Sequence, residues 1–348
     1  MKALRFKKIS ALLLVLLLLV SLGACSSGGN GGEGEEQQSD EVIVLRWSNT
    51  ATYPSQPNVI MREFKKVLEE KTDRIKVQLY EAGSYGGPNE MVQALQSGTM
   101  HVVTFPAGFF ATVAPDITVL DIPFLFKDPE EANDILNGET PALDEYLHSQ
   151  GLDAVCWIYE SGKDILLNKE VKSLADLKGL NIRTYSSPAS QDEITALGAV
   201  PIMLSSADVA MGLQQGTIDG VHCGNTFSVP AKLYELTDYY LKAPGTQNPI
   251  PVMFSKTFLD NLPDDLRELL LTTVKEIVLG MGNEYAVQYV NECYDTLEAA
   301  DIKIIEPTPQ LLAEMEEATA GIAEKYTSKS ENIAKIYNEL VQLRDANR

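Results

Sequence analysis

The chain has 348 residues, of which 45% are hydrophobic and 22% are charged, as is ordinary for a globular protein. This length allows a large core and favours two domains over one. Lys and Arg number 28 against 49 Asp and Glu, which gives a formal net charge of −21. So acidic a chain argues against binding nucleic acid or anionic lipid through a basic face. It does not exclude a small anionic ligand in a closed site, where a single Arg fork can dominate.

Residues 1–25 predict an export signal. Basic residues precede an apolar run from Ala11 to Val20, which is too short for a stable membrane span. The sequence Leu-Gly-Ala-Cys that ends at Cys25 resembles a bacterial lipobox, in which this cysteine becomes the lipidated first residue of the mature chain. An ordinary signal peptide with an incidental cysteine is the alternative. Residues 26–40 are rich in Gly, Ser and acids and predict a flexible linker. We therefore expect an extracytoplasmic protein with a lipid anchor, on the outer face of the cytoplasmic membrane or in the periplasm.

The remaining cysteines, Cys156, Cys223 and Cys293, allow one disulfide at most and show no metal-ligand spacing. We expect Cys156 and Cys293 to be buried small hydrophobes. The three histidines are scattered along the chain and are expected to be structural: His101, His148 and His222. No metal site and no cofactor is predicted.

After the linker, the pattern predicts alternating strands and helices. This β-α-β-α-β order implies a parallel sheet, whose loops at the carboxyl ends of the strands are available to a ligand. Asn49 follows the first strand, and Phe105 and Phe109 follow the third, so all three are candidate ligand residues, although the two phenylalanines suit the core equally well. The predicted elements are a strand over 41–48, a helix through 59–68, a strand over 75–80, a helix that Gly98 ends and a strand over 101–105.

The middle of the chain predicts a second lobe of the same kind. Residues 120–126 are expected to be an apolar connector in the core, and Asp128 to cap a helix that reaches about residue 150. We place the first crossover between the lobes near two strands over 154–159 and 165–168. Then follow a helix with capping-box spacing from Ser173 to Gly179, a strand over 180–185, a helix over 188–197, a strand over 201–204, a helix over 205–216 and a strand over 218–222. Two α/β lobes imply a cleft between them.

Arg183 is the first candidate for ligand binding. It lies near the carboxyl end of the strand over 180–185, where a fixed cation is well placed to meet an anionic ligand in an open α/β sheet.

The last third of the chain predicts a return to the first lobe and a long helix. A strand over 250–255 is expected to cross back, and helical periodicity over 264–300 predicts a helix of roughly 55 Å that spans both lobes and kinks near Gly280. A strand over 302–305 and acidic amphipathic helices complete the chain. The predicted lobes are 41–165 plus 250–290 for lobe I and 166–249 plus 291–348 for lobe II, which includes part of the long helix.

Several runs of residues together resemble the solute-binding proteins of tripartite ATP-independent periplasmic (TRAP) transporters, of the dicarboxylate-binding type. The runs are ALQSGTMHVV, LDIPFLF, LADLKGLNIRT with Arg183, ITALGAVPIML and the stretch from Asp208 to Gly220. The similarity covers about residues 42 to 310. It implies a two-lobed, periplasmic-binding-protein-like α/β fold that closes over a small organic acid, and membrane permease subunits as partners. It also implies that Arg183 holds the ligand carboxylate through a bidentate pair.

Departures from the family pattern mark further candidates. Asp164 stands where many members have a second arginine, with Lys163 beside it, and Cys223 replaces an asparagine that contacts ligand in the family. In the pocket that the resemblance implies, these polar residues of the family therefore differ in this chain, and Arg183 is retained.

Three more candidates follow from the same comparison. Ser186 lies where the family often places a polar contact, Ser206 replaces an aromatic residue, and Tyr185 adds an aromatic ring beside Arg183. One cation, one anion and several aromatics favour a zwitterion or an apolar monocarboxylate, such as an amino-acid-like or aromatic acid. They argue against sialic acid and simple C4-dicarboxylates.

Two other functions stay open at this point. No Gly-x-Ser-x-Gly, His-Glu-x-x-His or Ser-x-x-Lys motif occurs, so an enzyme is not expected, but a secreted enzyme on this scaffold would be revealed by ligand turnover. A lipoprotein that senses a ligand for a membrane receptor would use the same cleft, and neighbouring permease genes would distinguish it from a transport protein.

Overall fold

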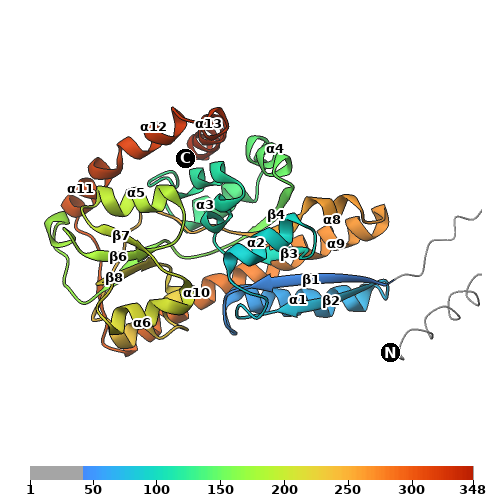
Figure 1. Ribbon diagram of the computed structural model, residues 1–348, viewed down its shortest axis with the longest axis horizontal. Helices are drawn as coiled ribbons and strands as arrows, with labels where there is room; N and C mark the ends of the chain where they lie inside the picture. The colour runs from blue at the N-terminus through green and yellow to red at the C-terminus, as the bar shows by residue number, and fades with distance from the viewer. Residues whose placement is uncertain (1–41, 348) are drawn as a thin grey trace, which may run out of the picture. The chain divides into compact units, whose positions relative to one another are not determined.

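The computed structural model describes residues 42–347. The predicted signal peptide, the lipidation site Cys25 and the linker lie outside the described residues. Residues 42–347 form two β-sheets, one of five strands and one of six, with helices on both faces of each (Figure 1). None of the helices in this range is both long and apolar enough to cross a membrane. The expected α/β class with two sheets is confirmed.

The first sheet has the strand order β2-β1-β3-β10-β4. Strand β1 pairs in parallel with β2 and β3, as the β-α-β-α-β order predicts. Strand β10 enters the sheet antiparallel between β3 and β4, so the predicted return of the chain is confirmed. The strands are β1 (Ile43–Asn49), β2 (Ile75–Tyr80), β3 (Val102–Thr104), β4 (Leu152–Ile158) and β10 (Ile250–Ser255).

The second sheet has the order β11-β9-β5-β8-β6-β7. Strand β6 is parallel to β7 and β8, whereas β5 is antiparallel to β8 and β9. The strands are β5 (Asp164–Leu167), β6 (Asn181–Thr184), β7 (Val200–Met203), β8 (Gly220–Cys223), β9 (Tyr239–Leu241) and β11 (Lys303–Ile305). The sequence pattern did not predict β9, a strand of three residues.

Apolar side chains fill both faces of each sheet. On β5, Leu166 packs in one cluster with α6 and Leu297 of α10, while its neighbours Ile165 and Leu167 pack in another with Ile194 of α5. Figure 1 shows α5 and α6 on opposite sides of β6–β8. The helices are α1 (Gln56–Lys71), α2 (Pro88–Gln96), α3 (Pro129–Leu136), α4 (Pro141–Ser149), α5 (Pro188–Ala196), α6 (Val209–Gln214), α7 (Asn225–Ser228), α8 (Lys256–Asp260), α9 (Asp264–Ile277), α10 (Asn283–Ala299), α11 (Pro309–Thr319), α12 (Gly321–Thr327) and α13 (Glu331–Ala346).

Two of the predicted helices differ from the structure. The single helix expected from Asp128 to about residue 150 is two helices, α3 and α4, because Gly138 follows the end of α3 and Pro141, which has no N–H to donate, opens α4. The helix expected from Ser173 to Gly179 is only a 3₁₀ turn, η3 (Leu174–Asp176), although its capping box forms as predicted.

The long helix over 264–300 kinks at the glycines, as predicted. Helix α9 passes into a π-helical segment, η6 (Val278–Gly282), before α10 begins, and Gly280 has the non-helical angles φ −90° and ψ −113°. Helix α9 buries Leu270 and Val274 in a cluster on the first sheet, and α10 buries Leu297 in a cluster on the second. The helix therefore spans both sheets.

The C-terminal helix α13 corrects the predicted division of the chain, which placed 291–348 with lobe II. Its residues Ile333, Ile336 and Leu340 pack in the cluster that holds Met253 of the first sheet and the apolar side of α4. Helix α13 thus covers first-sheet elements. The prediction was wrong because the apolar stripe of a helix shows that this face is buried but does not show which element it packs against. The other lobe boundaries stay predictions.

The cysteines Cys156, Cys223 and Cys293 are free and buried. Cys156 packs with first-sheet side chains, and Cys293 is 2% exposed, so both are buried small residues as predicted. Nδ1 of His101 accepts a hydrogen bond from the backbone N–H of Arg46, and its ring stacks on Phe258.

Candidate functional site

Three sequence-predicted site residues form a row across the second sheet. Asp164 of β5 lies directly opposite Cys223 of β8, and Arg183 of β6 lies opposite Val221 of β8. Side chains two residues apart on a strand point to the same face. Asp164, Cys223 and Arg183 therefore lie on one face, near the end of β8 that leads into α7.

Arg183 is buried and has no anionic partner among residues 42–347. The residue is only 2% exposed. Its Nε donates a hydrogen bond to the carbonyl of Leu204 at 3.1 Å, and its guanidinium carbon lies 5.7 Å from the ring centroid of Phe227. Nη2 is buried and has no acceptor among residues 42–347. Burial lowers the pKa of Arg183. A buried guanidinium with an unpaired N–H costs free energy. A ligand that supplies an acceptor would remove this cost, and an anionic acceptor would also compensate the charge.

Asp164, in contrast, is well supplied with donors. Its carboxylate accepts hydrogen bonds from Tyr240 Oη at 2.7 Å, the backbone N–H of Ala243 at 2.8 Å and Tyr294 Oη at 3.2 Å. Burial raises the pKa of Asp164 to about 6, and the three hydrogen bonds oppose that rise. About one of its four acceptor positions is left. The geometry thus gives Asp164 a role in holding Tyr240 and Tyr294 and leaves little capacity for a ligand.

Lys163 is a buried cation next to Asp164 in the sequence, but its side chain pairs with Asp121. Lys163 is fully buried and forms an ion pair with Asp121 of the 3₁₀ segment η2 (Pro115–Asp121). Its Nζ also donates to Ser190 Oγ at 2.9 Å and lies 4.9 Å from the ring centroid of Tyr185. Lys163 therefore connects first-lobe η2 to α5 and β6 of the second sheet. Sequence reasoning noted Lys163 but did not select it, because residue spacing alone does not say which of two adjacent side chains is paired.

The predicted aromatic residues come together. Phe109, in the 3₁₀ segment η1 (Ala107–Thr112), lies edge-on to Phe105 at 5.7 Å and stacks on Tyr185 at 5.0 Å between ring centroids. Tyr185 Oη donates to Asp121 Oδ1 at 3.1 Å. Phe105 is 2% exposed and belongs to the apolar cluster of the first lobe, so it is a core residue, which was the alternative to a ligand contact. Phe109 and Tyr185 form the aromatic contact between first-lobe η1 and the second sheet.

The other three predicted residues lie at separate places. Ser186 is half-buried after β6, and Ser206, also half-buried, begins the 3₁₀ turn η4 (Ser206–Asp208). Asn49 is fully buried at the end of β1, where its Nδ2 donates to Asn58 Oδ1 at 2.8 Å and its Oδ1 has no donor among the described residues. The side-chain hydrogen bonds of Asn49 within residues 42–347 go to Asn58 and Met61 and not to the row on the second sheet.

A buried carboxylate that sequence reasoning missed lies between the two sheets. Glu160 follows β4 and is 7% exposed. It accepts hydrogen bonds from Thr226 Oγ1 at 2.6 Å, the backbone N–H of Ser161 at 2.8 Å and Gln56 Nε2 at 3.1 Å. Burial raises the pKa of Glu160 to about 7. The run Tyr159-Glu160-Ser161 carries no motif, and only the strand order brings it beside α1 and α7.

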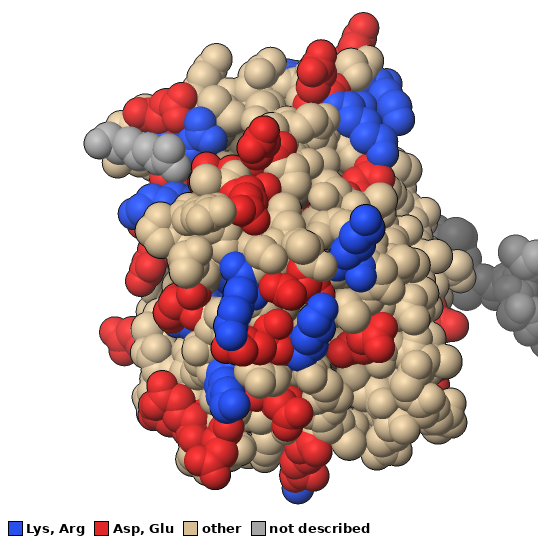
Figure 2. Space-filling view, turned by 90° about the vertical axis from the view of Figure 1, so that its left-hand side faces the viewer, with Lys and Arg blue, Asp and Glu red and all other residues tan. Residues whose placement is uncertain are grey.

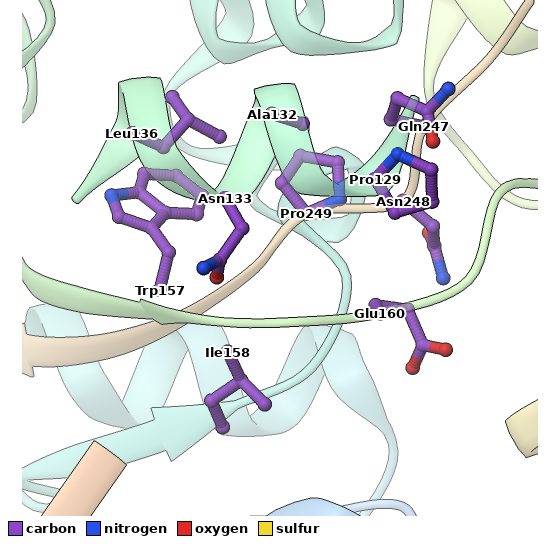
Figure 3. Close-up of a pocket in the computed structure, with 10 residues that line it drawn as sticks. All are labelled: Pro129, Ala132, Asn133, Leu136, Trp157, Ile158, Glu160, Gln247, Asn248 and Pro249. Carbon is purple, nitrogen blue, oxygen red and sulfur yellow. The ribbon is translucent and has the colours of Figure 1, made fainter. Parts of the chain in front are cut away.

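Two cavities lie away from Arg183. One, shown in Figure 3 between α3 and the crossing segments at Trp157 and Pro249, has a volume of about 10 Å³, which is room for about one water molecule. The other, of about 480 Å³, lies beside β9 and β11 and is lined by Tyr234, Asp238 and Lys303 among others. Neither includes a predicted site residue. The candidate site is the buried row of Arg183 and Cys223 with the neighbouring Phe227, together with Glu160, which also lines the smaller cavity.

Comparisons with known proteins show the family to which this chain belongs. A family model described as bacterial extracellular solute-binding protein, family 7, matches residues 50–330. The 2,3-diketo-L-gulonate-binding periplasmic protein YiaO of Escherichia coli (strain K12) is 27% identical over 235 residues, which are 67% of this chain and 72% of that protein. The ectoine/5-hydroxyectoine-binding periplasmic protein UehA of Ruegeria pomeroyi is 26% identical over 257 residues, 73% of each chain.

Solved structures share the fold. A TRAP periplasmic solute-binding protein from Sulfitobacter sp. NAS-14.1, with bound β-D-galacturonate, superposes with a TM-score of 0.81 and covers 86% of this chain and 99% of its own. At 20% identity this is a likeness of fold.

Proposed function

Because the chain belongs to family 7 of the bacterial extracellular solute-binding proteins, we propose that it is the extracytoplasmic receptor of a TRAP transporter. In this role it binds a small organic carboxylate through Arg183 and delivers it to membrane permease subunits. Lys163, directly before β5, and Arg183 of β6 are both buried cations beside the second sheet, but Lys163 has a carboxylate partner and Arg183 has none among residues 42–347.

The unpaired guanidinium is the observation that carries the proposal. Arg183 Nη2 is buried and has no acceptor in the described part of the chain, while Nε donates to the carbonyl of Leu204, which fixes the plane of the group. A ligand carboxylate would supply the missing acceptor and the compensating charge in a site closed to water. Such a pair is short and strong, since both partners are charged.

Closure over the ligand follows from how the lobes are joined. The chain crosses between the sheets after β4, before β10 and through the kinked helix α9–η6–α10. A ligand that contacts both lobes favours the closed arrangement by its extra contacts there. The rings of Phe109 and Tyr185, which stack between η1 and the second sheet, would be held together in the closed arrangement.

For the ligand class, the site favours an amino-acid-like or aromatic acid. Arg183 is unpaired within residues 42–347, and two buried carboxylates lie in the same region: burial raises the pKa of the Cys223 thiol, and the charges of Asp164 and Glu160 raise it further. A second anionic group of a dicarboxylate would be repelled by them. Relatives are named for a keto sugar acid and for ectoine, so the family scaffold accommodates ligands of both kinds.

The proposed location is the outer face of the cytoplasmic membrane, through a lipid on Cys25 and the acidic, Gly-rich linker that follows. Cells that express the Cys25→Ala chain should release it into the soluble extracytoplasmic fraction, whereas the parent chain should sediment with membranes. A parent chain found wholly in the soluble fraction would contradict the anchor.

Ligand binding is tested on the purified full-length protein. A thermal-shift screen with amino acids, aromatic acids, sugar acids and dicarboxylates identifies a ligand, since a compound that binds only the folded form raises Tm. Arg183→Ala and Arg183→Lys should then weaken its binding in calorimetry by about 3–5 kcal/mol, because the ligand carboxylate is left buried without its partner. The control is Arg74→Ala, which removes a surface arginine paired with Asp265. Equal binding by the Arg183 variants and the parent would refute the role of Arg183.

A further inference from the structure

Glu160 is a carboxylate that both lobes enclose. It lies in the segment that leaves β4 for β5, and Figure 3 shows its carboxylate directed away from Trp157 and Leu136 of the small cavity. Its donors come from opposite sides: Gln56 opens α1 beside the first sheet, and Thr226 lies in α7 beside the second. The carboxylate is therefore in the contact between the lobes.

All donors to Glu160 are neutral. They are the hydroxyls of Thr226 and Ser161, the backbone N–H of Ser161 and the amide of Gln56. No Lys, Arg or His of residues 42–347 forms an ion pair with it, and its pKa rises to about 7 because burial outweighs these hydrogen bonds. Asp121 differs because it pairs with Lys163, whereas Asp164 is likewise held by neutral donors but has few acceptor positions left. A buried carboxylate without a cation is costly, and a cation brought by a ligand would compensate it.

Glu160 and Arg183 contact consecutive residues of the short helix α7. The hydroxyl of Thr226 holds Glu160, and the ring of Phe227, the next residue, faces the guanidinium of Arg183. Neighbouring Cα atoms are about 3.8 Å apart. Arg183 and Glu160 form no ion pair with each other within residues 42–347, so each charge is left for one end of a ligand.

Two side-chain amides near Glu160 present unused acceptors. Gln56 donates its Nε2 to Glu160 Oε2 at 3.1 Å, and Asn225 donates its Nδ2 to the carbonyl of Val290 at 3.0 Å. These acceptors determine which end of each amide is nitrogen, so the orphaned atoms are Gln56 Oε1 and Asn225 Oδ1, both buried without a donor among residues 42–347. An ammonium group has three donors and no acceptor.

We propose that Glu160, with the amide oxygens of Gln56 and Asn225, holds the ammonium group of an amino-acid-like zwitterion whose carboxylate binds Arg183. This inference rests on the proposed function and narrows its ligand class. A sugar acid would offer hydroxyl donors to the same oxygens, but it would leave the charge of Glu160 without a counter-charge in a closed site. An aromatic acid without an ammonium group would supply neither donors to these oxygens nor a counter-charge for Glu160.

The first test compares matched ligand pairs on the purified full-length protein. Each pair keeps the carbon frame and removes only the ammonium charge: phenylalanine against 3-phenylpropionate, and leucine against 4-methylpentanoate. Glucuronate and succinate are included as acids without nitrogen. The amino acid of at least one pair should bind at least about tenfold more tightly than its partner in calorimetry. Tighter binding of the partners, or of glucuronate or succinate, overturns the inference.

The second test uses Glu160→Gln, which keeps the shape of the side chain and removes its charge. The amino acid should lose at least about tenfold in affinity while its partner without nitrogen changes by less than about twofold. Glu193→Gln is the matched control, since Glu193 is also a buried carboxylate with a pKa of about 7 and packs with His222, which alternates with Cys223 onto the opposite face of β8. The control should leave the ratio of affinities unchanged.

The outcomes separate this inference from the proposed function. If carboxylates without nitrogen bind as tightly as the amino acids and still depend on Arg183, the role of Glu160 is wrong and the receptor function stands. If no acid binds and Arg183→Ala changes nothing, the receptor function itself is wrong. Unfolding curves of Glu160→Gln without ligand show whether the variant is folded, and the ligand pairs on the parent protein give an answer that depends on no variant.

Discussion

The ring of Phe109 stacks on the ring of Tyr185, with centroids 5.0 Å apart and planes at 28°. Phe109 belongs to η1 of the first lobe and Tyr185 follows β6 of the second sheet, so the stack joins the lobes. Phe105 contacts the other side of Phe109 but is part of the first-lobe core. The two phenylalanines therefore have different roles, although sequence reasoning treated them alike.

Replacing these two phenylalanines should separate stability from binding. Phe105→Ala removes a fully buried ring and should lower the free energy of unfolding by about 3–5 kcal/mol. Phe109→Ala removes a half-buried ring and its stack on Tyr185, and should cost only about 1–2 kcal/mol while weakening ligand binding. Urea unfolding and calorimetry with the ligand from the screen measure the two effects. Equal loss of stability in both variants would contradict the assignment.

Gly108 tests how closely the lobes must approach. A Cβ on Gly108 would collide with the ring of Tyr185, the carboxylate of Asp121 and the Cβ of Ser187. Gly108→Ala should therefore push η1 away from the second lobe and lower both Tm and ligand affinity. At Gly321 an added Cβ meets nothing within 4 Å, so Gly321→Ala is the control and should leave binding unchanged. Normal affinity in Gly108→Ala would show that this contact is not needed for closure.

The two buried cations should respond in opposite ways to removal of their charge. Lys163→Met leaves Asp121 buried without its partner and should destabilise the ligand-free protein by about 3–5 kcal/mol. Arg183→Met removes a guanidinium that has an unpaired N–H, so the ligand-free protein should be as stable as the parent or more stable by about 1–3 kcal/mol. Urea unfolding without ligand measures both. A strong loss of stability in Arg183→Met would mean that Arg183 has a structural role.

Glu193 predicts a pH-dependent difference in stability. Burial raises the pKa of Glu193 from its usual value of 4.5 to about 7, so between these values the folded protein holds a proton that the unfolded chain has released. The contribution of Glu193 to stability therefore falls as the pH rises from 4.5 to about 7. Glu193→Gln should gain stability relative to the parent across this window and keep a constant difference above it.

The measurement for Glu193 is urea unfolding of both proteins across a pH series. The neighbouring groups are Lys163, Asp121 and His222, and all three are present in both proteins. Burial lowers the pKa of His222 to about 3. A difference that stays the same from pH 4.5 to 8 would contradict the raised pKa of Glu193.

Local sequence predicted much of the fold because its signals act within a few residues. Alternating apolar residues predicted β1, β2 and β6, and the glycines after α5 and α6 predicted where these helices end. The signal was weaker where proline and glycine fell within a helical pattern, so that α3 and α4 were predicted as one helix. The resemblance to TRAP solute-binding proteins, confirmed by the family match, rested on ordered motifs of this local kind.

By itself the sequence determined the α/β class, the crossing helix with its kink near Gly280, and Arg183 as the candidate cation at a strand end. The tertiary structure decided which charges have partners. Lys163 pairs with Asp121, 42 residues away, and Glu160 receives donors from Gln56 and Thr226, 104 and 66 residues away. Residue spacing cannot predict such pairs, because pairing depends on which strands are neighbours and which face each side chain takes. Arg183 is set apart from Lys163 by the absence of a carboxylate partner within residues 42–347, which only the packed structure reveals.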